Sequence, residues 1–210
     1  HGHKIGVKCV KDIVTECVEI GISYLTLYSF SEENWQRPKR EVFFLMHLLN
    51  QYLHDELPTM MDNEIKLLAI GDTEKLPLKS KLKLNETIEK TKDNKGMKLI
   101  LALSYGSRQE IVKAISKTCK NILDNKSILN ENELLKLFES NLYTSNIPDP
   151  DFLIRTGGEI RISNFLLWQI AYTELYVTDT LWPDFTKEEL LLALDDYGRR
   201  ERRFGKVTHA

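Results

Sequence analysis

Short apolar runs that alternate with stretches of helical periodicity constrain the fold of this chain more than any other feature. Each run is only a few residues long, is rich in β-branched or aromatic side chains and is followed by turn-forming residues, which is typical of buried strands. Such runs predict strands at Tyr24–Phe30, Ile65–Ile70, Met97–Leu103, Phe152–Ile154 and Glu174–Val177. Between them, apolar residues at helical spacing predict helices at Lys4–Ile20, Lys39–Met61, Leu76–Asp93, Gln109–Leu123, Glu131–Leu142 and from Thr186 to about Arg203.

This alternation predicts an α/β fold with a central, mostly parallel β-sheet flanked by helices. Parallel neighbours need long crossover connections, and helices usually supply them while covering both faces of the sheet. No internal repeat and no low-complexity linker interrupts the sequence of 210 residues. We therefore expect a single domain over residues 1–210.

Charge and cysteine content limit the classes of partner and compartment. The 29 Lys and Arg residues against 31 Asp and Glu residues give a formal net charge of −2, which argues against a general nucleic-acid binder. Cys9, Cys17 and Cys119 show no CxxC spacing, so we expect core thiols in a reducing compartment. No apolar run approaches the roughly 18 residues of a membrane span, and no signal peptide is visible, which predicts a soluble, cytoplasmic protein.

The segment Asp151–Thr178 predicts an anion site. It reads DFLIRTGGEIRISNFLLWQIAYTELYVT, so a strand, a tight glycine turn and a second buried element at Phe165–Tyr172 follow one another, with Arg155, Arg161 and Ser163 at their junction. Arginine offers a rigid fork of donors, and glycine lets backbone N–H groups come close to a ligand. The pattern favours a diphosphate site, and the alternative is a structural corner whose arginines pair with carboxylates.

Polar residues also follow the other predicted strands, at Ser31–Arg37, Gly71–Asp72 and Tyr105–Arg108. Ligands of open parallel sheets bind beyond the carboxyl ends of the strands. We therefore expect three arginine-bearing loops to meet at one edge of the sheet and to form a local cluster of positive charge there.

Several of these residues have an ordinary structural alternative. Trp35 would staple a loop to the core, Asn34 would cap a turn, and Asp72 would be a turn residue. His3 by itself would be an exposed terminal histidine. Glu174 lies in an apolar context where an unpaired carboxylate is costly, so we expect a cation or an arginine partner for it.

The predicted helix Lys39–Met61 is apolar over most of its circumference. Such a helix is either buried on several sides or lines an apolar cavity. An anion site beside an apolar cavity would suit an amphiphilic substrate with an anionic head and a hydrocarbon tail.

Five motifs resemble the cis-prenyltransferases. They are GHK at Gly2–Lys4, FSEENWQRP at Phe30–Pro38, IGD at Ile70–Asp72, SYGSR at Ser104–Arg108, and LIRTGGEIRISNFLLWQIAYTELYVTDTLWPDF, which begins at Leu153. The resemblance extends from Gly2 to about Gly205, and within the family it is strongest to the bacterial undecaprenyl diphosphate synthases.

This resemblance implies a mainly parallel α/β fold and a homodimer. It also implies the Mg²⁺-dependent condensation of isopentenyl diphosphate with an allylic diphosphate such as farnesyl diphosphate. The product would be a cis-polyprenyl diphosphate such as undecaprenyl diphosphate, and contact with a membrane would help its release.

The resemblance also implies roles for particular residues. The implied substrate-binding residues are His3, Ser31, Glu32, Glu33, Trp35, Arg37, Arg155, Arg161, Ile162 and Ser163. Within this set, Arg155, Arg161 and Ser163 would hold isopentenyl diphosphate. The catalytic residue would be Asn34, assisting proton removal, and Glu174 would help to bind Mg²⁺.

The family places a first strand and a D-G-N-x-R-W-A segment directly before the GHK motif. The aspartate of that segment binds Mg²⁺ and the allylic diphosphate in the family, and the sequence begins at His1 without it. We therefore expect that the protein has an upstream part, and that these 210 residues alone would be catalytically impaired.

Two other functions are open at this point. A non-catalytic partner subunit of a heteromeric prenyltransferase would fit the missing aspartate, whereas the intact Ser31–Arg37 and RTGGEIRIS segments argue for an enzyme. Another kind of α/β phosphate enzyme would need a fingerprint such as GxGxxG or GxxxxGKS/T, and neither occurs.

Overall fold

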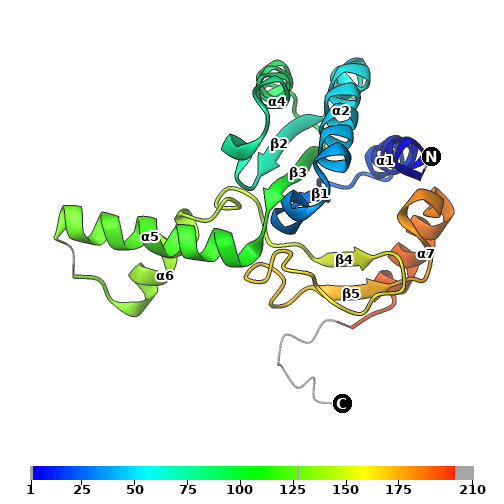
Figure 1. Ribbon diagram of the computed structural model, residues 1–210. Helices are drawn as coiled ribbons and strands as arrows, with labels where there is room; N and C mark the ends of the chain where they lie inside the picture. Colours follow the sequence, from blue (N-terminus) through cyan, green and yellow to red (C-terminus); the bar gives the residue numbers. More distant parts are fainter. Residues whose placement is uncertain (1, 127, 202–210) are drawn as a thin grey trace, which may run out of the picture.

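The computed structural model describes residues 2–126 and 128–201, including the side chains of all of these except residues 2–5 and 7. Its strands are β1 (Tyr24–Ser31), β2 (Lys66–Ile70), β3 (Lys98–Tyr105), β4 (Phe152–Arg155) and β5 (Glu174–Val177). They form two ladders, one with the order β1-β3-β2 and one with β4 beside β5 (Figure 1). Every strand pairing in the described part of the chain is parallel, which confirms the predicted α/β class with a parallel sheet flanked by helices.

The helices lie around these ladders in three groups. They are α1 (Gly2–Glu19), α2 (Lys39–Asp55), α3 (Leu57–Asp62), α4 (Leu78–Thr91), α5 (Ser107–Asn125), α6 (Glu131–Ser140) and α7 (Lys187–Gly198), with 3-10 turns η1 (Glu32–Gln36), η2 (Thr73–Lys75) and η3 (Trp182–Asp184). Figure 1 shows α1, α2 and α4 gathered around the larger ladder and α7 beside β4 and β5. The pair α5 and α6 extends away from both ladders as an arm.

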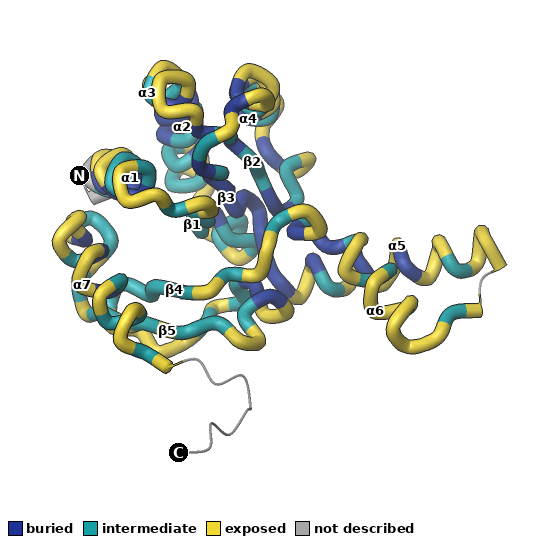
Figure 2. The backbone as a smooth tube through the Cα atoms, turned by 180° about the vertical axis from the view of Figure 1, so that it is seen from behind, coloured by how far each residue is buried: buried dark blue, intermediate teal, exposed yellow. Residues whose placement is uncertain are grey.

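Strand β3 carries the core on both of its faces. Leu99, Leu101 and Leu103 pack into a large apolar cluster with α1, α2 and α4, whereas Ile100 and Ala102 point into a smaller cluster on the other side. Successive side chains of a strand point to opposite faces, and here all five are at most 2% exposed. Figure 2 shows the same strand as the most continuously buried part of the backbone.

The predicted helix Lys39–Met61 is wrong as a single element. Helix α2 ends at Asp55 and α3 begins at Leu57, with Pro58 in the first turn of α3. Proline has no N–H, and its ring clashes with the carbonyl four residues earlier, so it is accepted at the start of a new helix but not inside a continuous one. Phe43, part of the apolar set, is 77% exposed.

The second buried element predicted at Phe165–Tyr172 is also wrong. This stretch is a series of turns, in which Leu166 adopts a φ of 47°. Only Leu166 and Gln169 are buried within it, whereas Tyr172 is 73% exposed. The apolar composition therefore does not form a helix or a strand here, because its apolar side chains point in several directions.

The remaining predicted helices and strands agree with the structure to within a few residues, except at the last helix. Helix α7 ends at Gly198, several residues before Arg203, which lies outside the described residues. At the end of β2, Gly71 has a φ of 109°, and a Cβ there would lie 2.1 Å from the carbonyl oxygen of Leu103. Only glycine permits this close approach of β2 to β3.

The cysteines do not all lie in the core. Cys9 and Cys17 are buried in α1, and burial raises the pKa of the Cys9 thiol to about 11 and that of Cys17 to about 12. Cys119 is exposed on α5, so the expectation of a core thiol is wrong there. Within residues 2–126 and 128–201, no helix combines the length and the apolar character that crossing a membrane requires.

Candidate active site

A large apolar cavity lies between the strand ladders and helix α2. Its volume is about 770 Å³. The lining residues include Thr26–Phe30 of β1, Leu45, Met46, Leu48, Leu49 and Tyr52 of α2, Leu153–Thr156 of β4 and its following turn, and Arg161 with Ile162. The sequence left open whether the apolar face of α2 is buried or lines a cavity. In the structure it does both.

Two arginines lie in the wall of this cavity. Arg155 ends β4, and its Nε is buried without a hydrogen-bond partner among the described residues. Arg161 is 61% exposed at its side chain and pairs with Glu159, with 2.6 Å between Nη1 and Oε2. A buried guanidinium N–H without an acceptor is costly, so Arg155 has donor capacity left for an anion.

Tyr28 connects the arginine side of the cavity to the neighbouring strand. Its hydroxyl donates to the carbonyl oxygens of Tyr105 at 3.2 Å and, more weakly, of Ser163 at 3.4 Å. Burial raises the pKa of Tyr28 to about 12, and the charge of Glu33 adds to this, while Arg155 acts in the opposite direction. The phenol therefore stays protonated and acts as a hydrogen-bond donor near neutral pH.

The glycine turn after β4 does not offer its N–H groups to a ligand. Gly157 and Gly158 have φ values of 89° and 72°, and their N–H groups donate to the carbonyls of Thr180 and Thr178, each at 2.9 Å. The expectation that these amides approach an anion is therefore wrong. Their physical role is to fold the turn back onto the chain that follows β5.

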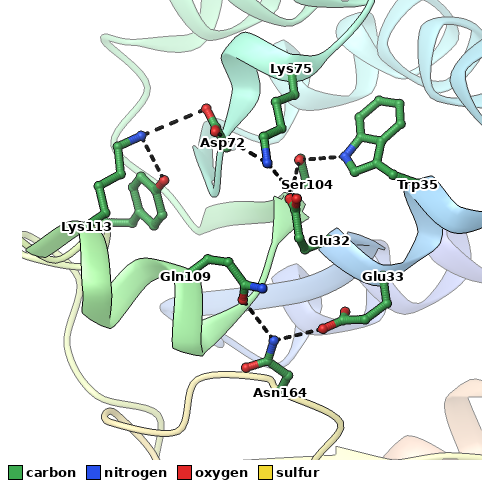
Figure 3. A network of polar contacts seen from close by, with 10 residues as sticks. Glu32, Glu33, Trp35, Asp72, Lys75, Ser104, Gln109, Lys113 and Asn164 are labelled. Atoms are coloured by element: carbon green, nitrogen blue, oxygen red, sulfur yellow. Dashed lines mark hydrogen bonds and ion pairs between the residues drawn. The ribbon is translucent and has the colours of Figure 1, made fainter.

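The predicted substrate loop forms a 3-10 turn that is fastened to β3. Figure 3 shows Ser104 at the end of β3 accepting a hydrogen bond from the indole N–H of Trp35 at 2.8 Å and donating to Glu32 at 3.0 Å. Glu32 also pairs with Lys75 of η2 at 2.5 Å. Trp35 packs edge-on against Phe30, with 4.8 Å between ring centroids. Trp35 thus staples the loop to the core, as the structural alternative predicts.

Asn34 and Arg37 also have structural partners. The side-chain oxygen of Asn34 accepts the backbone N–H of Ser31 at 3.0 Å, which is a capping contact at the start of η1. Arg37 pairs with Glu41 at 2.8 Å on the exposed first turn of α2. Neither Arg37 nor Arg108 is among the residues that line the cavity, so of the three arginine-bearing loops only the one with Arg155 and Arg161 brings its arginines to the cavity.

Asp72 takes part in a looser group of charges at the end of β2. Its carboxylate oxygens lie 3.9 Å from the ammonium groups of Lys75 and Lys113, and Lys113 donates to Tyr143 at 3.1 Å (Figure 3). The position of Asp72 after Gly71 is that of a turn residue with two distant cationic neighbours.

Glu174 has the arginine partner that its apolar context predicts. Its Oε2 lies 3.0 Å from Nη1 of Arg200, and Arg200 also pairs with Asp196 at 2.5 Å. Within the described residues, no group of three or more His, Cys, Asp or Glu side chains is arranged to hold a metal ion. The residues described therefore do not by themselves fit a Mg²⁺ site at Glu174.

The remaining predicted site residues differ in where they lie. Ile162 lines the cavity, and Ser163 is exposed beside it with a φ of 54°. His3 is in the first turn of α1, and its side chain lies outside the described residues. The sequence did not single out Ser104 or Asn164, although both lie within the motifs that it did single out.

The parallel strands of this α/β fold border an apolar cavity, and two arginines lie in its wall. Such a site is typical of a protein that binds an amphiphilic anion. Comparison with known proteins makes this specific, because residues 1–205 match the family described as putative undecaprenyl diphosphate synthase. The chain belongs to this family of prenyltransferases.

Individual relatives agree with this assignment over nearly the whole chain. An isoprenyl transferase of Geobacter sulfurreducens is 50% identical over 208 residues, which are 99% of this chain and 84% of that protein. One of Clostridium tetani is 49% identical over 206 residues, covering 98% of this chain and 80% of that protein.

Two solved structures share the fold. Lavandulyl diphosphate synthase from Lavandula x intermedia, solved in complex with dimethylallyl diphosphate, has a TM-score of 0.91 and 38% identity over 97% of this chain and 88% of that one. A probable undecaprenyl diphosphate synthase from Campylobacter jejuni has a TM-score of 0.82 and 39% identity over 97% of this chain and 93% of that one. Nothing in these similarities favours a non-catalytic partner subunit.

Proposed function

We propose that the protein condenses isopentenyl diphosphate with an allylic diphosphate, such as farnesyl diphosphate, to give a cis-polyprenyl diphosphate such as undecaprenyl diphosphate. The observation that carries this proposal is the pair Arg155 and Arg161 in the wall of a cavity of about 770 Å³. The arginines suit the charged head of such a substrate, and the leucines of α2 suit its hydrocarbon tail. Membership of a prenyltransferase family supports the reaction class.

The related lavandulyl diphosphate synthase supports the substrate class. That protein was solved with dimethylallyl diphosphate, which is an allylic diphosphate, and it shares the fold at a TM-score of 0.91. The same chemistry in this chain would place an allylic diphosphate beside isopentenyl diphosphate.

The proposed reaction makes one carbon–carbon bond in each cycle. The allylic carbon–oxygen bond breaks and releases diphosphate, the double bond of isopentenyl diphosphate attacks the allylic carbon, and the adduct loses a proton to form the new cis double bond. Donors held in place by the protein stabilise charge better than mobile water does, and holding both substrates in contact removes an entropic cost. Arg155, Arg161 and Ser163 would hold isopentenyl diphosphate, with Ile162 against its carbon skeleton.

The loop Ser31–Arg37 would bind substrate from the other side. In this proposal Ser31, Glu32, Glu33, Trp35 and Arg37 contribute to that surface, and Asn34 assists removal of the proton. His3 would lie near the phosphates.

Mg²⁺ dependence and the role of Glu174 as a metal ligand follow from the family resemblance alone. Mg²⁺ would supply charge neutralisation for the diphosphate leaving group.

The apolar cavity would take the growing chain. Each added five-carbon unit gains at most about 4 kcal/mol on burial, taking ~0.8 kcal/mol per buried carbon. The product would therefore bind more tightly as it grows, and its release would limit turnover unless a membrane accepts it. We also propose a cytoplasmic homodimer with peripheral membrane contact. In it, residues 1–210 would belong to a single prenyltransferase domain whose first strand and aspartate loop lie upstream.

Incubation of the intact protein with labelled isopentenyl diphosphate, farnesyl diphosphate and Mg²⁺ tests the proposal, followed by sizing of the lipid and analysis of its double bonds. We expect a ladder of products that differ by five carbons and carry new cis bonds. The same incubation with excess EDTA tests the metal requirement. Absence of labelled lipid at any ratio of the two substrates would overturn the proposed function.

A further inference from the structure

Asn164 joins two segments that are far apart in the sequence. Its Nδ2 donates to Oε1 of Glu33 at 2.9 Å and to Oε1 of Gln109 at 3.0 Å, as Figure 3 shows. Its Oδ1 accepts the backbone N–H of Arg108 at 2.9 Å, and its backbone carbonyl accepts the N–H of Ser107 at 2.8 Å. One residue therefore contacts both the predicted substrate loop and the start of α5.

These partners fix the orientation of the Asn164 amide. The backbone N–H of Arg108 is a donor, so it requires the amide oxygen, and the Glu33 carboxylate is an acceptor, so it requires the amide nitrogen. Burial acts to raise the pKa of Glu33, but hydrogen bonds from Asn164, its own backbone and Ser31 outweigh burial and lower that pKa. A charged Glu33 and a donating Asn164 thus match one another.

The backbone around Asn164 is shaped for this contact. Asn164 has a φ of 60°, in the left-handed region that asparagine tolerates better than most residues. Its oxygens satisfy two of the first N–H groups of α5, which have no partner inside the helix. At Gly106, the N-cap of α5, a Cβ would lie 2.8 Å from Nδ2 of Asn164, so a larger residue there would displace the amide from its present position.

We propose that Asn164 is a positioning residue that couples the loop Ser31–Arg37 to the segment Arg161–Ser163. Asn164 follows Ser163 directly, so fastening its side chain to Glu33 sets the distance between the two parts of the site. This inference rests on the proposed function, in which Arg161 and Ser163 hold isopentenyl diphosphate and the loop Ser31–Arg37 contacts substrate from the other side. Because of the Asn164–Glu33 contact, a substrate held by Arg161 and Ser163 is positioned correctly only when the loop Ser31–Arg37 is in place.

The kinetic test replaces Asn164 with a side chain of the same shape and the wrong charge. Asn164→Asp places a carboxylate oxygen against Glu33 in an exposed contact, so the two segments repel one another and kcat/KM for isopentenyl diphosphate should fall by about 10-fold. The KM for isopentenyl diphosphate should rise together with that for the allylic substrate, because Asn164 acts on the distance between both sites. A change confined to the amount of folded protein, with normal kinetics per folded molecule, would contradict a positioning role.

The second variant restores the contact with donor and acceptor exchanged. In Asn164→Asp combined with Glu33→Gln, the new amide at position 33 donates to the new carboxylate at position 164, and Gln109 can turn its amide to donate as well. The double variant should recover to within about 5-fold of Glu33→Gln alone, which is a coupling that independent sites do not show. If the two losses multiply instead, the Glu33–Asn164 contact does not couple the segments.

Hydrogen exchange of the intact protein without substrate separates this inference from the proposed function. Asn164→Asp should speed exchange of the amides of residues 31–36, and the double variant should slow it again, whereas the amide of Arg108 should stay protected because the carboxylate keeps its acceptor oxygen. The matched control is Asn125→Asp near the end of α5, where the amide contacts only the carbonyl of Asn121, at 2.9 Å, among the described contacts. Unchanged exchange in Asn164→Asp would overturn the coupling, whereas inactive wild-type protein with altered exchange would overturn the proposed function alone.

Discussion

Arg155 in the wall of the cavity and the loop Glu32–Trp35, which does not line the cavity, differ in how far the protein itself satisfies their polar groups. On the arginine side, the Nε of Arg155 is buried with no acceptor among the described residues, beside an apolar cavity. On the loop side, Glu32, Glu33 and Trp35 each have a protein partner at 3.0 Å or less. A side chain with unused donors is the better sign of a ligand than a side chain that is merely polar and near a strand end.

The comparison therefore predicts that the arginine side contributes most of the binding energy for the diphosphate. The loop side is held together without a ligand, and its main contribution would be shape and orientation. The following substitutions test this difference between the arginine side and the loop side.

The largest effect is expected for Arg155→Ala. Removal of one partner of a desolvated, charge-assisted contact costs about 3 kcal/mol, so affinity for isopentenyl diphosphate should fall by about 100-fold. Calorimetric binding and kcat/KM both measure it. Arg40→Ala is the matched control, because Arg40 is exposed in the first turn of α2 and does not line the cavity. Equal losses in both variants would show that the effect is general charge and not a specific contact.

The next effect concerns the hydrocarbon end of the same cavity. Leu49 of α2 lines it, so Leu49→Trp should shorten the final product by at least one five-carbon unit and Leu49→Ala should lengthen it. Product sizing on a reversed-phase column measures the change. Phe43→Ala is the control on the same helix, since Phe43 is 77% exposed. If both positions change only the stability of the protein, α2 is core and not the wall of a product channel.

A smaller effect is expected for Glu174→Gln. The ion pair with Arg200 is partly exposed, so its loss should lower the free energy of unfolding by only about 0.5–1 kcal/mol, measured by urea denaturation. Arg200→Ala should cause a similar loss. If Glu174 only forms the ion pair, the Mg²⁺ concentration for half-maximal activity should stay unchanged in both variants. A rise of that concentration in Glu174→Gln but not in Arg200→Ala would show that Glu174 binds the metal.

The smallest effect concerns acid stability. Hydrogen bonds lower the pKa of Glu33 in the folded state, so its contribution to stability is present above its ordinary pKa and is lost as the pH falls through the lowered value. Glu33→Gln should therefore be slightly less stable than the wild type near neutral pH, and this difference should shrink as the pH falls below about 4.5, so that the thermal stability of the variant depends less on pH. A steeper acid dependence in the variant would show that the carboxylate is strained in the folded protein.

Much of the fold could be predicted because the pattern of apolar residues is local. The runs at Tyr24–Phe30 and Met97–Leu103 identify β1 and β3, and the spacing in Lys4–Ile20 identifies α1. The errors arise where a single residue overrides a pattern, as Pro58 does between α2 and α3. They also arise where the same composition fits several backbones, as in Phe165–Tyr172.

The site was predicted less completely, because partners cannot be seen in one sequence. Three groups of the expected anion cluster already have protein partners. Arg37 pairs with Glu41, and the N–H groups of Gly157 and Gly158 donate to backbone carbonyls. The roles of the remaining site residues stay predictions. Ser104 and Asn164 were missed since a serine or asparagine with a positive φ carries no distinctive sequence signal.

By itself, the sequence determined the α/β class, the positions of most strands and helices, and the family, because periodicity and long motifs are properties of the chain alone. Only the tertiary structure decided which polar groups are already used and which are left for a ligand. The reason is that a hydrogen bond depends on two groups meeting at about 3 Å in a set direction, and residues as distant in sequence as Glu33 and Asn164 meet only once the chain has folded.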